Sequence, residues 1–348
     1  MKQQSVIAQK GEIEFRSKLF QQQVEGKSIF DDEFDPNAME EILLDRMKNT
    51  CDQMVQLKES GVILSPYLEI GAERCQRSLV MENEIGSSGA AADISFDMLK
   101  SCDHYKHIFN KNKEPLRICC DANNLPFLSN SVPFVFCYET LHHFPDPAPV
   151  VKEVHRVLSG GGHFFFDEEP YRRILHVNLY KRKKIYSQES LRAGYIRKIF
   201  DHFFSASNCN EVEYGIIEND DISLRIWKQA LSNFGEKKVK LHYLRHFDSE
   251  LFNPKHSVRN FLASLFGGGI SGICRKSGVL KNEITAINEL LICPSCLESG
   301  FESKLYRKDH SFICSKCDEK FPVVENVAFL FSLKKLQLLY PGICMKNS

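Results

Sequence analysis

A regular alternation of short apolar runs and helical stretches between residues 67 and 169 most constrains how this chain can fold. Strands that alternate with helices predict a parallel sheet with helices on both faces. We therefore expect a chain of the α/β class. The predicted strands span residues 67–71, 89–93, 117–120, 133–137 and 163–166.

A glycine or a polar residue stands where each predicted strand ends. Right-handed crossovers place the carboxyl ends of parallel strands on one edge of the sheet, where ligands of such sheets bind. The sequence therefore predicts a ligand site at this edge. The residues concerned are Gly71, Asp93, Asp121, Tyr138 and Asp167.

Gly71 and Asp93 together indicate a nucleotide-like cofactor. A glycine lets the backbone approach a ligand closely, because no side chain stands in the way. An acid about twenty residues further on accepts hydrogen bonds from ribose hydroxyls. Gly71 is not followed by the G-x-G-x-x-G spacing that a dinucleotide needs, which disfavours a dehydrogenase.

Composition sets further limits. The 348 residues suffice for two domains, and 45 basic residues balance 45 acidic ones, so no overall field attracts nucleic acid or membranes. We expect no membrane span and no signal peptide. The 13 cysteines indicate reduced thiols and metal ligands, and hence a cytoplasmic protein.

The flanking regions complete the predicted domain. Residues 1 to about 35 are interpreted as a loosely attached arm, and residues 38–60 as a helix that packs on the sheet edge or also closes over the cofactor. A helix at 222–234 precedes two last strands, at 238–244 and 267–275. Together with the first five strands, these give seven.

Residues 171–200 are unusually basic. They hold nine lysines and arginines against the single acid Glu189, with five aromatic residues interleaved. Such a run forms either a solvated face or a lid that meets an anionic substrate, such as a phosphate or nucleic acid. We expect a helical cap over the sheet edge at 170–206.

Two C-x-x-C pairs mark the C-terminal region. The first pair is Cys293 and Cys296, the second is Cys314 and Cys317, and seventeen residues separate them. This spacing fits one tetrahedral zinc site of four thiolates; the alternative is four buried or free thiols. A module of ~45 residues buries little core, so a metal would stabilise its fold.

Four segments resemble the S-adenosylmethionine-dependent methyltransferases of the ubiquinone-biosynthesis type. They are Asp121–Phe127, Ser131–Tyr138, Leu141–Pro147 and Val151–Gly162. The resemblance covers roughly residues 65–170 well and extends to about residue 278. It implies a seven-stranded Rossmann-like sheet with helices on both faces, and S-adenosyl-L-methionine as cofactor.

The resemblance also implies roles for individual residues. Glu69 and Gly71 would lie beside the methionine part of the cofactor, Asp93 at the ribose, and Asp121 at the adenine amino group. The implied cofactor-binding residues are Glu69, Gly71, Asp93, Ile94, Asp121, Ala122 and Tyr138. One departure concerns cofactor affinity rather than the fold: Glu73 and Cys75 replace the family's second and third glycines. Their side chains would crowd the carboxypropyl group or redirect the turn.

The C-terminal module resembles small zinc-ribbon activator proteins that pair with RNA- and protein-modifying methyltransferases. The similarity includes Phe321–Leu330, after the second cysteine pair. Those proteins usually carry glycine and proline where Asn326 and Ala328 stand here.

A base is needed only for some methyl acceptors. Some oxygen and nitrogen nucleophiles need a group that removes their proton, whereas carbon or amine methylation can proceed without a dedicated base. The nearby candidates are His142, His143, Glu139 and Glu168. We expect one of the two histidines only to pack or to cap a helix.

Three functions follow from these patterns. The first is a methyltransferase acting on a small or lipid-like, anionic metabolite. The second is methylation of RNA or protein, with the ribbon recognising the macromolecule. The third is a non-catalytic scaffold whose turn no longer binds the cofactor. The predicted domains are an arm and helix (1–60), the methyltransferase domain (61–278) and the zinc ribbon with its structural Zn²⁺ (291–335).

Overall fold

The computed structural model describes residues 2–25, 36–175, 179–181, 204–206, 219, 222–243, 247–280 and 285–345. The helical cap expected at 170–206 falls mostly outside these residues. Of that stretch, the structure describes residues 170–175, 179–181 and 204–206; β6 (Tyr180–Lys181) pairs with β7 (Ser205–Ala206) in a separate sheet of two strands. No helix in the described part of the chain is long and apolar enough to cross a membrane.

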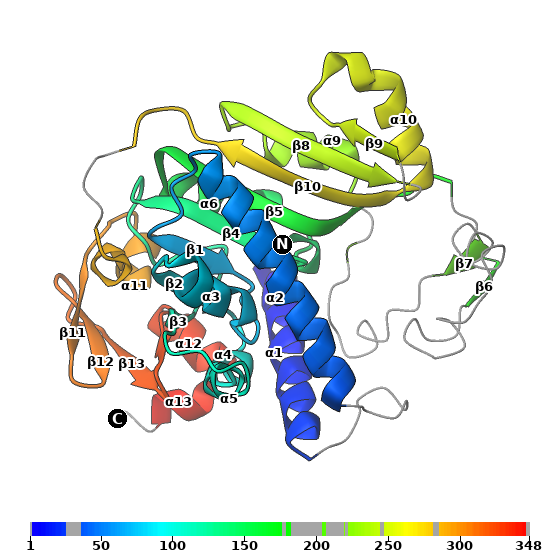
Figure 1. Ribbon diagram of the computed structural model, residues 1–348. Coiled ribbons are helices and arrows are strands. Elements are labelled where there is room, and N and C mark those ends of the chain that lie inside the picture. The colour runs from blue at the N-terminus through cyan, green and yellow to red at the C-terminus, as the bar shows by residue number, and fades with distance from the viewer. Residues whose placement is uncertain are drawn as a thin grey trace.

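One twisted sheet forms the centre of the molecule (Figure 1). Its middle contains β1 (Tyr67–Ile70), β2 (Gly89–Asp93), β3 (Leu116–Cys119), β4 (Val132–Tyr138) and β5 (Leu158–Tyr171). These five strands run parallel in the order β3-β2-β1-β4-β5, which confirms the predicted parallel core. β10 (Gly268–Arg275) follows antiparallel to β5, and β8 (Glu236–Tyr243) pairs with β10.

Among the described residues the sheet holds twelve strands, so the expectation of seven was wrong. On one side, β9 (Phe247–Glu250) forms a hairpin with β8. On the other side, β14 (Val327–Phe329) pairs in parallel with β3 and brings in β11 (Leu305–Lys308), β12 (Ser311–Cys314) and β13 (Lys320–Val324). The backbone groups on the outer side of β3 would otherwise lack strand partners, and β14 satisfies them.

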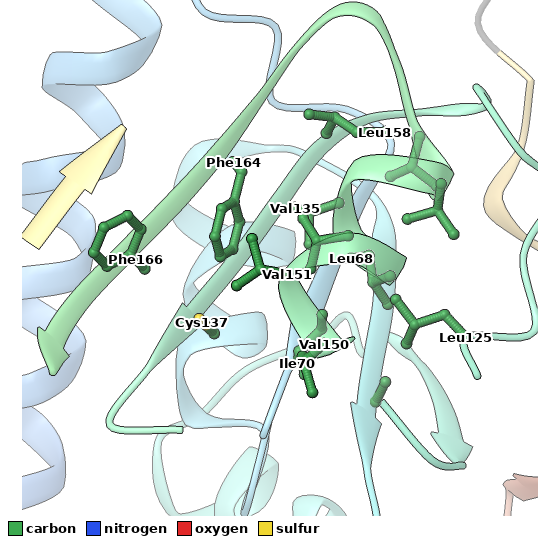
Figure 2. Packing of buried hydrophobic residues seen from close by; sticks show 14 of the residues in the cluster. Leu68, Ile70, Leu125, Val135, Cys137, Val150, Val151, Leu158, Phe164 and Phe166 are labelled. Atoms are coloured by element: carbon green, nitrogen blue, oxygen red, sulfur yellow. The ribbon is translucent and has the colours of Figure 1, made fainter. Parts of the chain in front are cut away.

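Helices cover both faces of the sheet. α6 (Ala148–Val157) buries a stripe of valines at helical spacing against β1, β4 and β5 (Figure 2). α9 (Leu224–Ala230) packs on the same face through Trp227, whose ring stacks 5.5 Å from that of Phe166. α2 (Pro36–Glu59) and α3 (Gln76–Val80) cover the aromatic residues of the opposite face. The other helices include α4 (Phe96–Lys100), α5 (Cys102–Ile108), α10 (Ser257–Phe266) and α11 (Pro294–Glu298).

The N-terminal residues form a helix rather than the expected loose arm. α1 (Lys2–Val24) packs against α4 and buries Ile13 and Phe15. Its Arg16 pairs with Glu73 in the turn after β1. The first helix therefore lies at the edge where the ligand site is predicted.

The C-terminal region continues from the ribbon strands onto the sheet. After β14 the chain forms α12 (Leu333–Leu339) and α13 (Pro341–Met345), drawn in red beneath β3 in Figure 1. Phe329 is fully buried, with its ring 5.0 Å from that of Phe96 and 5.3 Å from that of Tyr340. These rings join the last strand to α4 and to the end of α12.

Replacement of Phe329 should destabilise the whole chain. We expect Phe329→Ala to lower the free energy of unfolding by about 3–4 kcal/mol, because a buried ring is lost and a cavity remains. Leu333 has 51% of its surface exposed and provides the control; Leu333→Ala should cost no more than about 0.5 kcal/mol. Denaturant titration of both variants measures this, and equal small effects would show that β14 contributes little to the core.

Candidate functional site

The turn after β1 keeps a glycine-like backbone despite its substitutions. Gly71, Glu73 and Cys75 have φ angles of 68°, 47° and 60°. This left-handed conformation is open to glycine but costs other residues roughly 1–2 kcal/mol each. The alternating pattern of the turn is therefore retained, and the added side chains are what distinguish this site.

Gly71 is needed for close packing. A Cβ atom at this position would lie 2.2 Å from Thr140 Oγ1, which is too close for any residue with a side chain. The turn thus lies directly against the segment that follows β4. Because that segment carries both predicted histidines, the glycine turn and the histidines belong to one site.

Two of the implied cofactor acids, one buried and one partly buried, lie in surroundings that disfavour their charged forms. Glu69 is 1% exposed and accepts a hydrogen bond from Ser78; burial raises its pKa to about 7, although Ser78 and Arg77 oppose this. Asp93 accepts from the backbone N–H groups of Glu73, at 2.9 Å, and Ser95, at 2.8 Å. Burial raises the pKa of Asp93 to about 6 despite these bonds.

The third acid, Asp121, is held in its charged form. Burial opposes ionisation, but the ammonium of Lys335 and hydrogen bonds from Asn123 outweigh it, so the pKa of Asp121 lies below its usual value. Ala122 follows at the same strand end and is partly buried. The backbone carbonyl of Ile94 accepts a 2.6 Å hydrogen bond from the Tyr340 hydroxyl.

Tyr138 lies between Gln53 and Arg77 at the end of β4. Its hydroxyl donates to Gln53 Oε1 at 2.7 Å, and the Arg77 guanidinium carbon lies 4.2 Å from its ring centroid. Arg77 also pairs with Glu168 at 3.0 Å. Sequence reasoning missed this buried arginine, which stands in the first turn of α3.

Several polar atoms at the start of α3 lack partners. The Nε atoms of Arg74 and Arg77 and both amide atoms of Gln76 find no hydrogen-bond partner among the described residues. All three residues are at most 4% exposed. Unpartnered buried polar groups are costly, and they fit a site that a polar ligand completes.

Glu169 organises the two predicted histidines. Its fully buried carboxylate accepts from the backbone N–H groups of Thr140, Leu141 and His142, at 2.8, 2.8 and 3.2 Å. It also lies 2.9 Å from His142 Nδ1, and the His143 ring lies 4.3 Å from that of His142. Sequence reasoning named the neighbouring Glu168 instead. The three acids in a row at the end of β5 were the available signal.

The other two acids considered as bases lie among cations. Glu139 pairs with Arg46 at 2.8 Å, and Glu168 pairs with Arg77. Burial raises the pKa of Glu168, although Arg77 opposes this. Both acids are more exposed than Glu169, so they lie on the outer side of the edge.

α1 contributes charges to the same edge. Arg16 lies 2.7 Å from Glu12 and 3.4 Å from Glu73, while Ser17 donates to Asp97. Burial would raise the pKa of Glu12, but Arg16 and then His143 lower it below its usual value. α1 therefore places a charged pair, Glu12 and Arg16, beside the turn after β1.

The four C-terminal cysteines converge. Their sulfur atoms all lie within 4.8 Å of one another, with 3.7 Å between Cys293 and Cys317 and between Cys296 and Cys314. Four thiolates about 2.3 Å from a tetrahedral zinc would be about 3.8 Å apart. Backbone N–H groups of Cys296 and Cys317 point at sulfur atoms, at 3.4 Å. The donor set therefore fits a tetrahedral metal ion.

Comparison with known proteins agrees with this fold. Residues 68–166 match the family described as Methyltransferase domain, which supports a methyltransferase over this part of the chain. Two chloroplastic proteins of Arabidopsis thaliana, both described as uncharacterized methyltransferases, are 38% identical over 92 residues and 34% identical over 77 residues. These matches cover 25% and 21% of this chain. The chain spans about a quarter of the length of these relatives, 25% and 22%.

Solved methyltransferase structures resemble the chain at low identity. A Galdieria sulphuraria protein assigned provisionally as a sarcosine dimethylglycine methyltransferase gives a TM-score of 0.44 at 14% identity, covering 76% of this chain and 98% of that one. A Haloferax volcanii complex of the Trm112 methyltransferase activator with a provisionally assigned methyltransferase gives a TM-score of 0.38 at 15% identity, covering 67% of this chain and 95% of that one. An S-adenosylmethionine-dependent methyltransferase from Mesorhizobium loti gives 0.39 at 16%, covering 60% and 90%. Function is therefore inferred from the site residues and the family match.

The raised pKa of Glu69 predicts a pH-dependent stability. An unfolded glutamate has a pKa of about 4.3, so the folded chain binds the extra proton between that value and about 7. Stability should therefore fall as the pH rises through this window. Glu69→Gln removes the charge, and we expect it to raise the free energy of unfolding at about pH 8 by about 3–4 kcal/mol, because one pKa unit corresponds to about 1.4 kcal/mol.

Urea unfolding at several pH values measures this effect. Glu289→Gln replaces an exposed acid and should leave the slope of stability against pH unchanged. If Glu69→Gln keeps the parent slope, another group carries the proton.

Removal of one cysteine should release the metal. We expect the purified chain to carry one zinc ion, and Cys296→Ser to lose it together with part of the thermal stability, because a three-thiolate site binds more weakly. Cys51 lies outside the cluster, so Cys51→Ser should retain the metal. Elemental analysis measures the zinc content of the parent and both variants. A parent protein without metal would favour four free thiols over a zinc site.

Proposed function

We propose that this chain is an S-adenosylmethionine-dependent methyltransferase. The observation that carries the proposal is the placement of three acids, Glu69, Asp93 and Asp121, at the carboxyl ends of the adjacent parallel strands β1, β2 and β3. The turn that begins at Gly71 lies between them. The family match over residues 68–166 supports the same proposal.

The residues present suit the parts of this donor. Asp93 would accept from the ribose hydroxyls and Asp121 from the adenine amino group. The unpartnered guanidinium nitrogens of Arg74 and Arg77 suit the donor's carboxylate, and Glu69 suits its ammonium group. The bound donor would supply a methyl group on a positively charged sulfur, ready for in-line displacement.

Glu169 gives His142 a defined role. A carboxylate beside Nδ1 keeps the proton on that nitrogen, so Nε2 is the basic nitrogen of the ring. His142 would then take the proton from an oxygen or nitrogen acceptor, with Glu169 positioning it. We propose a small or lipid-like, anionic metabolite as the acceptor. The basic residues of 171–200 support this choice.

A macromolecular acceptor is the second candidate. β11 forms one edge of the sheet and exposes Tyr306, Arg307 and Lys308, while the Lys316 ammonium lies 3.6 Å from the Phe301 ring centroid. Aromatic and basic side chains together suit single-stranded nucleic acid. Steep weakening of RNA binding with salt would favour this function.

Loss of the ribose acid should weaken donor binding. We expect Asp93→Ala to lower the affinity for S-adenosylhomocysteine, the product form of the donor, at least about tenfold, because charged hydrogen bonds contribute about 1.5–3 kcal/mol. Asp248, an exposed acid on β9, provides the control Asp248→Ala. Calorimetry of the full chain measures both variants. Absence of binding by the parent at millimolar ligand would favour the non-catalytic scaffold.

Restoration of the turn glycine separates these interpretations further. Glu73→Gly relieves a left-handed glutamate and should tighten binding several-fold, because the side chain no longer crowds the turn. Binding that appears only in this variant would support a scaffold with a degenerate turn. Incubation of the parent with labelled donor and cell extract, followed by nuclease, protease or solvent extraction, identifies the acceptor class.

A further inference from the structure

The segment after the ribbon returns to the predicted donor site. Leu330 donates its backbone N–H to the carbonyl of Cys119 at 2.9 Å, so the chain leaves β14 beside the end of β3. Phe331 is 2% exposed and anchors this exit in the core. α12 then begins at Leu333 and presents Lys335 to the loop after β3.

Lys335 pairs with Asp121, the acid that would bind the adenine amino group. Its ammonium donates to Oδ2 of Asp121, while Oδ1 accepts from the backbone and the side chain of Asn123, each at 3.0 Å. Both carboxylate oxygens are therefore engaged. Asp121 is only 5% exposed, so an adenine amino group could use Oδ2 fully only if Lys335 withdrew.

Tyr340 closes the neighbouring strand end. Its hydroxyl donates to the Ile94 carbonyl at 2.6 Å and accepts from the Phe96 N–H at 3.1 Å. Its ring lies 5.3 Å from that of Phe329 and 6.0 Å from that of Phe331. The segment 330–340 thus contacts the ends of β2 and β3, the two strands whose acids would hold the adenosine half of the donor.

The four-cysteine module orients this segment. Ser332 Oγ donates to Glu298 Oε1 at 2.8 Å, and the Leu333 N–H donates to Glu319 Oε1 at 3.0 Å. Glu298 stands two residues after Cys296, and Glu319 two residues after Cys317. Both acids accept hydrogen bonds from the start of α12. The two cysteine turns therefore set the position of the helix that carries Lys335.

We propose that Lys335 sets the donor affinity of this protein. Its ammonium holds the Asp121 carboxylate in the ligand-free chain, and donor binding displaces it. The cysteine module holds α12 in place and thereby keeps Lys335 over the site. This role rests on the proposed function, because it requires that Asp121 binds the adenine amino group.

Removal of the ammonium should tighten binding. Lys335→Met keeps the approximate length of the side chain but removes the ammonium. The adenine amino group then no longer competes with Lys335 for Asp121 Oδ2. We expect the affinity for S-adenosylhomocysteine, measured by calorimetry on the metal-loaded full chain, to rise about tenfold. Lys334, the exposed neighbour, provides the matched control Lys334→Met, which should bind as the parent does.

Hydrogen exchange gives a readout independent of activity. Ligand added to the parent should speed amide exchange in 333–340, because Lys335 and its helix lose their contact with Asp121. Equal or weaker binding by Lys335→Met, with exchange in this segment unchanged or slowed, would overturn the role of Lys335 and leave the proposed function standing. Absence of binding by the parent, Lys334→Met and Lys335→Met would overturn both.

Discussion

Parallel pairing of β1 with β2 and β4 is the constraint on which the site depends. The register aligns Ile70 with Ala92 and with Cys137, so the three strands end at nearly the same level. Asp93 and Thr140 then contact the turn from its two sides. Asp93 accepts a hydrogen bond from the backbone N–H of Glu73, and Thr140 fills the space where a side chain at Gly71 would lie. A slip of one residue in either pairing would reverse the faces of that strand and separate these contacts.

The carboxylates of the edge fall into two electrostatic classes. Glu69 and Asp93 meet backbone and hydroxyl donors but little positive charge, and burial raises their pKa values to about 7 and about 6. Burial acts on Asp121 and Glu73 as well, yet Lys335 in one case and Arg74 with Arg16 in the other lower their pKa values. Lys335 and Arg16 come from the two ends of the chain, whereas Arg74 stands next to Glu73 in the turn itself, so both ends contribute to the charge of a site built by the middle of the chain.

Much of the core could be predicted from local patterns, and the rest depended on distant contacts. The strands that end at Gly71 and Asp93 could be predicted because both signals are local: the apolar run and the residue that ends it lie within a few positions of each other. The two cysteine pairs likewise predicted the cluster. Lys335 lies 214 residues from Asp121, and no local pattern links them. α1 has no apolar stripe at helical spacing, so its sequence did not predict a packed helix. The sequences of β14 and β3 likewise did not predict that these two strands pair.

The position of β14 also orders events during synthesis. β3 is complete once residue 119 has left the ribosome, but its outer partner arrives only with residues 327–329. For most of translation that flank of the sheet therefore has no strand beside it, and such flanks attract other chains. Slow decoding after residue 119 would prolong this unpaired state and raise the aggregation hazard of the nascent chain.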